Sequence, residues 1–93
     1  MKRKLLDILA CPIDKHYPLE LIELNVSDET IIDGILFCSK CGRYYPIMDE
    51  IPIMLPDDLR DEKEDLDFLK KWMEKIPEKI LYNGKPHHLN RKQ

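Results

Sequence analysis

The stretch Cys38-Ser39-Lys40-Cys41-Gly42-Arg43 carries the strongest structural signal in this sequence. Two cysteines separated by two residues and followed by a glycine are typical of one half of a structural zinc site, a zinc knuckle. A second stretch with the same spacing, Cys11-Pro12-Ile13-Asp14, has a carboxylate where the second thiolate would stand. Aspartate is an acceptable zinc ligand. One zinc ion per chain is therefore predicted, with the ligands Cys11, Asp14, Cys38 and Cys41.

Three alternatives to this site stay open. His16 is a second candidate for the fourth ligand, two residues beyond Asp14. The cysteines could instead pack as small buried apolar groups. A thioredoxin-like redox role is disfavoured, because such motifs open a helix after a strand, whereas Cys41 leads into Gly42 and an aromatic, proline-containing segment.

Length and charge limit the possible functions. The chain has 93 residues, a net charge of -3 and only three glycines, which predicts one small domain without a phosphate-binding loop and therefore without nucleotide-dependent catalysis. Between residues 11 and 56, eight acidic residues stand against three basic ones, a poor surface for nucleic-acid backbone. No signal peptide and no apolar run of about 18 residues is found, so a cytoplasmic protein without a membrane span is expected.

The apolar pattern predicts an α+β fold, a zinc-ribbon-like domain with an N-terminal helix, an antiparallel sheet and an additional C-terminal helix. In the first helix, residues 4–10, Leu5, Ile8 and Leu9 fall on one face, and Leu6 widens this apolar stripe. Strands are expected at 19–24, 30–37, 43–48 and 51–55, a helix at 66–76 with Leu66, Leu69, Met73 and Ile76 inward, and a short helix at 78–83 with Gly84 as its C-cap. The predicted organisation is a ribbon domain at 1–60, a helical extension at 61–84 and a flexible tail at 85–93.

The segment Ile51-Pro52-Ile53-Met54-Leu55-Pro56 is strongly apolar and contains two prolines. Proline cannot donate to a sheet ladder, so this segment is predicted to be an edge strand. An apolar edge strand is normally covered by another element or carries charged residues. This sequence shows neither a covering element nor charges within the segment. A partner chain is therefore expected to cover it. The tail beyond residue 84, with His87 and His88 among basic residues, is expected to be polar, and any contact with RNA would be indirect or through this tail.

An ordered set of motifs in residues 1–60 resembles a known family. The set comprises Leu5-Leu-Asp-Ile-Leu-Ala-Cys-Pro12, Pro18-Leu-Glu-Leu21, Gly34-Ile-Leu-Phe-Cys38, Cys41-Gly-Arg-Tyr-Tyr-Pro-Ile47 and Ile51-Pro-Ile-Met-Leu-Pro56. It is similar to the multifunctional methyltransferase subunit family, in its short prokaryotic form. The helix predicted at 66–76 lies outside the resemblance.

This resemblance implies a non-catalytic subunit that activates and stabilises class I S-adenosylmethionine-dependent methyltransferases acting on tRNA and other translation components. It implies a heterodimer in which the edge strand and an apolar patch bind the methyltransferase. The partner-binding residues are then expected to be Leu5, Leu9, Ile51, Ile53, Met54 and Leu55. A free-standing zinc ribbon that binds nucleic acid is the alternative, which the acidic ribbon disfavours.

Overall fold

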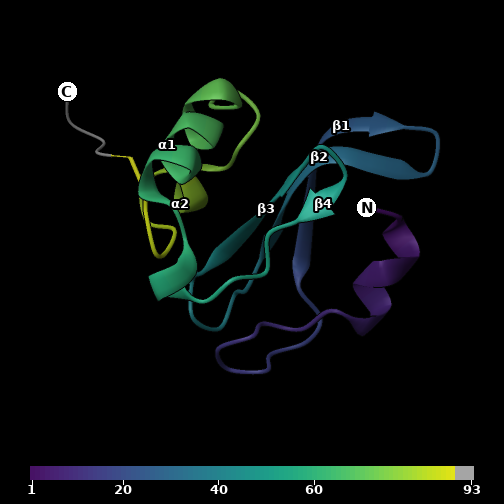
Figure 1. Ribbon diagram of the computed structural model, residues 1–93, viewed down its shortest axis with the longest axis horizontal. Helices are drawn as coiled ribbons and strands as arrows, with labels where there is room; N and C mark the ends of the chain where they lie inside the picture. The colour runs from purple at the N-terminus through teal and green to yellow at the C-terminus, as the bar shows by residue number, and fades with distance from the viewer. Residues whose placement is uncertain (90–93) are drawn as a thin grey trace.

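A computed structural model describes residues 1–89 of the chain. Its centre is one antiparallel sheet in which strands adjacent in sequence are adjacent in space (Figure 1). The strands are β1 (Glu20–Ser27), β2 (Thr30–Phe37), β3 (Tyr44–Met48) and β4 (Ile51–Pro52). The helices are the 3-10 helices η1 (Arg3–Ile8) and η2 (Asp57–Leu59) and the α-helices α1 (Glu62–Lys71) and α2 (Glu78–Leu81). The predicted α+β fold with a C-terminal helix is confirmed.

Strand alternation divides the buried side chains between two cores, one on each face of the sheet. Ile35 and Tyr44 belong to the core shared with α1 and α2. Leu36 and Tyr45, each one residue further along, belong to the core that includes Cys11 and Cys38 and against which η1 packs. Figure 1 shows the resulting layers, with α1 and α2 on one side of the sheet and η1 on the other.

The turn between β3 and β4 was placed correctly at Asp49 and Glu50. Both residues have positive φ angles, 53° and 73°, as a two-residue hairpin turn of the primed type requires. Met48 pairs with Ile51 directly across this turn. The turn thus brings the apolar segment after Glu50 back along the outer edge of β3.

The N-terminal helix differs from the prediction, because η1 is a 3-10 helix with three residues per turn. Residues three apart then lie on one face. Leu6 and Leu9 pack against the sheet, whereas Leu5 and Ile8 are exposed, Ile8 to 75%. The apolar face predicted from Leu5, Ile8 and Leu9, widened by Leu6, is thus divided, with two of these side chains buried against the sheet and two exposed.

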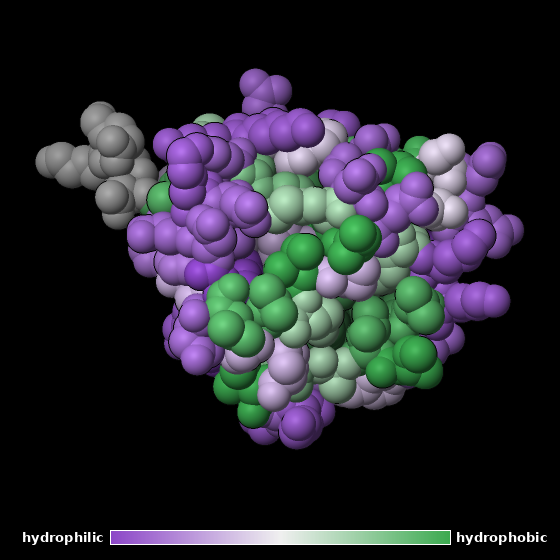
Figure 2. Space-filling view, in the orientation of Figure 1, coloured by the Kyte–Doolittle hydropathy of each residue, from purple (hydrophilic) through white to green (hydrophobic). Residues whose placement is uncertain are grey.

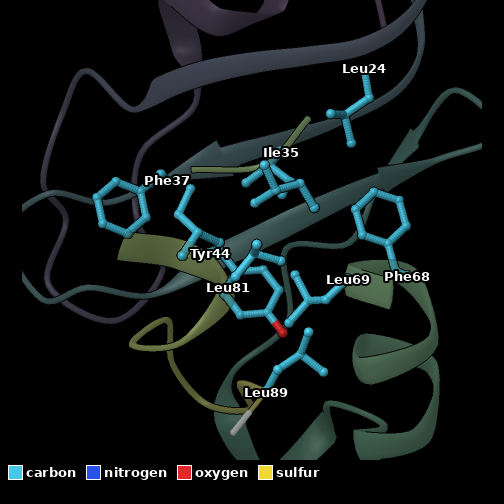
Figure 3. Packing of buried hydrophobic residues seen from close by; sticks show 10 residues of the cluster. Leu24, Ile35, Phe37, Tyr44, Phe68, Leu69, Leu81 and Leu89 are labelled. Atoms are coloured by element: carbon cyan, nitrogen blue, oxygen red, sulfur yellow. The ribbon is translucent and has the colours of Figure 1, made fainter. Parts of the chain in front are cut away.

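The helix α1 begins and ends earlier than predicted. Asp61 caps it by accepting a hydrogen bond from the Glu64 N–H at 3.2 Å. Because α1 ends at Lys71, Met73 points away from the core and is 41% exposed, contrary to its predicted inward position. Leu69 remains buried as predicted, and Figure 3 shows its side chain with those of Leu81 and Tyr44.

Gly84 was predicted as the C-cap of the helix at 78–83, but it has another role. It is not among the glycines with positive φ, and Tyr82 is the C-cap of α2. A Cβ atom at Gly84 would lie 2.6 Å from the Ile80 carbonyl oxygen and 2.7 Å from the Tyr44 ring. Glycine therefore permits close approach of the chain to the sheet.

Residues 85–89, predicted as the start of a flexible tail, lie against the domain. Lys85 accepts a hydrogen bond from the Tyr44 N–H at 3.1 Å and donates to the Gly42 carbonyl at 2.9 Å. Leu89 is buried and its N–H donates to the Leu81 carbonyl at 2.8 Å. The tail prediction is wrong for these residues, because main-chain pairing and apolar burial hold them, and positions 90–93 lie outside the described residues.

A buried charged cluster joins this C-terminal segment to α1. The Asp65 carboxylate lies 3.0 Å from Arg60 Nη2 and 2.9 Å from His87 Nδ1. His87 was expected to belong to a solvated tail, and its contact with Asp65 is a correction to that expectation. His88 is exposed, as expected. α1, α2 and the sheet share one core. The division into a ribbon domain at 1–60 and a helical extension at 61–84 stays a prediction.

Candidate metal centre and partner surface

The first knuckle is a tight loop closed by two main-chain hydrogen bonds. The Lys15 N–H donates to the Cys11 carbonyl at 2.8 Å, and the Cys11 N–H donates to the His16 carbonyl at 3.0 Å. Lys15 adopts a positive φ of 66°, which a side chain other than glycine adopts only at some cost. The loop turns the residue before Lys15, Asp14, back toward Cys11.

The second knuckle repeats this geometry. The Gly42 N–H donates to the Cys38 carbonyl at 2.8 Å, the Cys38 N–H donates to the Arg43 carbonyl at 2.8 Å, and Gly42 has a φ of 83°. Gly42 therefore corresponds to Lys15 of the first loop. By the same correspondence, Asp14 occupies the position that Cys41 occupies in the second loop.

The side chains of Cys11, Asp14, Cys38 and Cys41 converge, with one ligand atom from each lying within 4.8 Å of every other. The Sγ atoms of Cys11 and Cys41 are 3.8 Å apart, and Cys38 Sγ lies 3.6 Å from both carboxylate oxygens of Asp14. Zinc–sulfur bonds of about 2.3 Å and a zinc–oxygen bond of about 2.1 Å at tetrahedral angles correspond to separations of about 3.8 Å and 3.6 Å. The donor set therefore fits a tetrahedral zinc ion.

The electrostatics of these side chains favour an anionic oxygen ligand. A hydrogen bond from the His16 N–H is the main cause that lowers the pKa of Asp14 to about 2. Asp14 is thus charged at neutral pH, and His16 contributes its main chain while its ring does not join the four-residue group. Burial raises the pKa of Cys38 to about 12, so binding a metal must displace the proton of this thiol.

β4 is the edge of the sheet, as the prolines in its sequence predicted, but only Ile51 and Pro52 form the ladder. The chain then stays close to β3, because the Ile53 N–H donates to the Pro46 carbonyl at 2.8 Å. Main-chain groups of successive strand residues point in opposite directions. The outer edge is therefore formed by Pro52, which has no N–H, and by Met54.

The predicted partner-binding residues differ in their exposure. Ile51 is 60% exposed and Leu55 38%, and Leu5 is also exposed. Ile53 is half-buried, and Met54 and Leu9 pack against the core around Cys11 and Cys38. The assignment of these six side chains to a partner stays a prediction.

Ile8, which the sequence places on the apolar face of the first helix but which was not assigned to the partner surface, is 75% exposed. Ile13 and Tyr17 in the first knuckle are also exposed. Figure 2 shows hydrophobic residues gathered over the lower part of the face that carries β4 and η1. Within residues 1–89, no helix is long and apolar enough to cross a membrane.

Comparisons with known proteins agree on one family. Residues 2–50 match the family described as Trm112p-like protein. The chain is 40% identical over 68 residues to a UPF0434 protein of Nitrosococcus oceani, covering 71% of this chain and 100% of that protein. It is 44% identical over 69 residues to a UPF0434 protein of Stutzerimonas stutzeri, covering 72% of this chain and 98% of that protein.

A solved structure is similar in both sequence and fold. It is the complex between the Haloferax volcanii Trm112 methyltransferase activator and the putative methyltransferase, with 48% sequence identity and a TM-score of 0.58. The match covers 64% of this chain and 100% of the solved one. The resemblance found in the sequence is confirmed, and this chain belongs to the Trm112p-like family.

Proposed function

We propose that this protein is the non-catalytic activating and stabilising subunit of class I S-adenosylmethionine-dependent methyltransferases that modify tRNA and other translation components. The observation that carries the proposal is the solved relative, a methyltransferase activator in complex with a putative methyltransferase, at 48% sequence identity. The two chains form a heterodimer in the cytoplasm. The partner supplies the S-adenosylmethionine site and the reacting groups.

The edge of the sheet supports a strand-addition interface. An incoming strand can pair with the outer main-chain groups of Pro52 and Met54, since the Ile53 N–H already bonds to β3. Pro52 supplies only its carbonyl, so the Met54 N–H is the outward donor of this short segment. Side chains must therefore supply much of the affinity, and exposed Ile51 and Leu55 flank the pairing segment.

Zinc has a structural role in this proposal. Held by Cys11, Asp14, Cys38 and Cys41, the ion would join two loops that are far apart in the sequence. When bound, it supplies cross-linking energy to the fold and no reaction chemistry. The protein's own contribution is the pair of equivalent knuckle loops, which bring the four ligand atoms to within 4.8 Å of one another.

Charge placed on the apolar surface tests the proposed interface. Ile51→Asp and Leu55→Asp should each weaken binding of the methyltransferase by roughly 100-fold, because a carboxylate buried at the seam without a partner costs about 3 kcal/mol. Met73→Asp is the matched control, since Met73 is 41% exposed against 38% for Leu55 but follows α1 on the other side of the sheet. Met54→Asp is less informative, because Met54 packs into the protein's own core.

The readouts are co-purification and methyl transfer after co-expression with a methyltransferase from the same genome. Thermal melting of each isolated variant establishes that it remains folded. The proposal predicts loss of complex and activity for the two substitutions in and after β4, and retention of both for Met73→Asp. Stoichiometric, active complexes with Ile51→Asp and Leu55→Asp would show that this edge is not the interface.

A further inference from the structure

Two side chains around the start of β3 lie near the thiols of the candidate metal centre. The Tyr45 hydroxyl oxygen lies 3.1 Å from Cys11 Sγ. Arg43 stands two residues earlier, immediately before β3, and its guanidinium is close enough to Cys41 to interact with it electrostatically. We propose that Arg43 and Tyr45, here called the outer donors, stabilise the zinc-binding thiolates, one on each knuckle, and thereby set the affinity for zinc.

The charge of the site explains why such donors are needed. Three thiolates and one carboxylate around Zn²⁺ leave a net charge of about −2. Cys11 and Cys38 are fully buried, so water cannot stabilise this charge at their sulfur atoms. Negative charge away from water requires hydrogen-bond donors or a cation nearby. A guanidinium and a phenol hydroxyl are both donors, and they lie beside different thiols.

The direction of the Tyr45 hydrogen bond follows from its surroundings. Tyr45 is fully buried, and a phenol hydroxyl carries its proton at neutral pH. A thiolate has no proton to donate, and Tyr45 must then donate to Cys11.

The segment after β4 holds both outer donors in place. Asp57 accepts two hydrogen bonds from Arg43, from Nε and Nη2, each at 2.8 Å. The Arg60 guanidinium lies 5.7 Å from the centre of the Tyr45 ring, and its Nη1 donates to the Tyr44 carbonyl at 2.8 Å. This segment lies outside residues 2–50, the part that matches the family. The chain thus supports its metal centre partly with residues beyond the family match.

Two pairs of variants separate this role from general stability. Tyr45→Phe removes the hydroxyl beside Cys11, and Tyr44→Phe, its control, removes a hydroxyl that donates to the His87 carbonyl at 2.6 Å on the opposite face. Arg43→Gln removes the cation beside Cys41. Its control is Arg3→Gln, which breaks a comparable 2.7 Å contact with Glu23 away from the site.

The measurement is zinc affinity, by competition with a chromophoric chelator at fixed pH. We expect Tyr45→Phe and Arg43→Gln each to weaken zinc binding by about 10- to 100-fold, with both controls close to the wild type. In protein loaded with Co²⁺, Tyr45→Phe should also move the sulfur-to-metal charge-transfer band to longer wavelength, because the thiolate loses a hydrogen bond. Tyr44→Phe should leave that band unchanged.

The inference rests on the zinc site of the proposed function, and the outcomes distinguish the two. A wild-type chain that takes up no zinc would overturn both. If the wild type binds zinc and Tyr45→Phe and Arg43→Gln bind it with the same affinity, only the proposed role of the outer donors is overturned. Equal losses of zinc affinity in Tyr45→Phe and Tyr44→Phe would also overturn that role, since the loss would then reflect the stability of the fold. No methyltransferase enters the experiment, so the partner proposal is tested independently.

Discussion

Replacing Asp65 with asparagine tests how far one buried charge holds α1 to the sheet. The side chains of Arg60 and Asp65 are only 1% and 3% exposed, and their Nη2 and Oδ2 atoms are 3.0 Å apart. Asp65→Asn leaves the Arg60 guanidinium buried without its counter-charge. Breaking one partner of a buried ion pair costs about 3–5 kcal/mol in the free energy of unfolding.

The remaining contacts of Arg60 place the expected loss near the lower end of that range. Its Nη1 donates to the Tyr44 carbonyl, and its guanidinium lies 5.1 Å from the centre of the Tyr44 ring. Its Nη2 is close to Asp65 but misaligned for a hydrogen bond, and its Nε has no hydrogen-bond partner among residues 1–89. A loss of about 3 kcal/mol is a large part of the roughly 5–15 kcal/mol that stabilises a typical domain.

Asp67→Asn is the matched control, because Asp67 is on the same helix and pairs with Lys63 at 3.0 Å while 59% exposed. Water screens that pair, so the substitution should change stability far less. Urea unfolding followed by the fluorescence of the single tryptophan, Trp72, measures both variants. A loss for Asp65→Asn within 1 kcal/mol of the control would refute the reasoning. The double variant Arg60→Met/Asp65→Leu should recover most of the stability, since it leaves no buried charge.

Three further predictions concern the metal centre, stability at acid pH and cofactor binding. Asp14→Cys should tighten zinc binding and raise the melting temperature, because thiolate is the softer ligand; metal analysis and melting with and without chelator check this, and a chain that holds no zinc contradicts it. The hydrogen bond from Arg43 is the main cause that lowers the pKa of Asp57 in the folded protein. The pair therefore contributes its full stability above the unfolded-state pKa of Asp57. This contribution is lost as the pH falls through the lowered pKa of the folded state. Asp57→Asn should therefore flatten the acid side of the melting-temperature profile, and an unchanged profile would count against it. The isolated chain should show no S-adenosylmethionine binding by calorimetry, and measurable binding would overturn the activator proposal.

Local signals in the sequence were sufficient for most of the sheet. The strand predicted at 30–37 matches β2 in full, and the turn at Asp49 and Glu50 is where it was expected. Alternating apolar residues and short polar turns are strong local patterns, which explains this agreement. The two knuckle spacings likewise sufficed to name four residues that the structure brings together.

The features that were missed depend on contacts between distant residues. Arg60 and Asp65 stand in a strongly charged stretch of the sequence, and nothing nearby indicates that Asp65 meets His87, 22 residues further on. The 3-10 period of η1 could not be distinguished from an α-helix because Leu5, Leu6, Ile8 and Leu9 satisfy both patterns. The hydroxyl of Tyr45 beside Cys11 is likewise a long-range contact, 34 residues apart.

The central claim is that this chain activates a methyltransferase through the surface around β4. The most direct measurement is to purify the tagged chain and its Ile51→Asp variant from the source organism. Each preparation is then assayed for transfer of radiolabelled methyl groups from S-adenosylmethionine to that organism's tRNA, ribosomal RNA and protein fractions. The proposed function predicts methyl transfer by the wild-type preparation and none by the variant. Absence of transfer with the wild-type chain, or equal transfer with both, would contradict it.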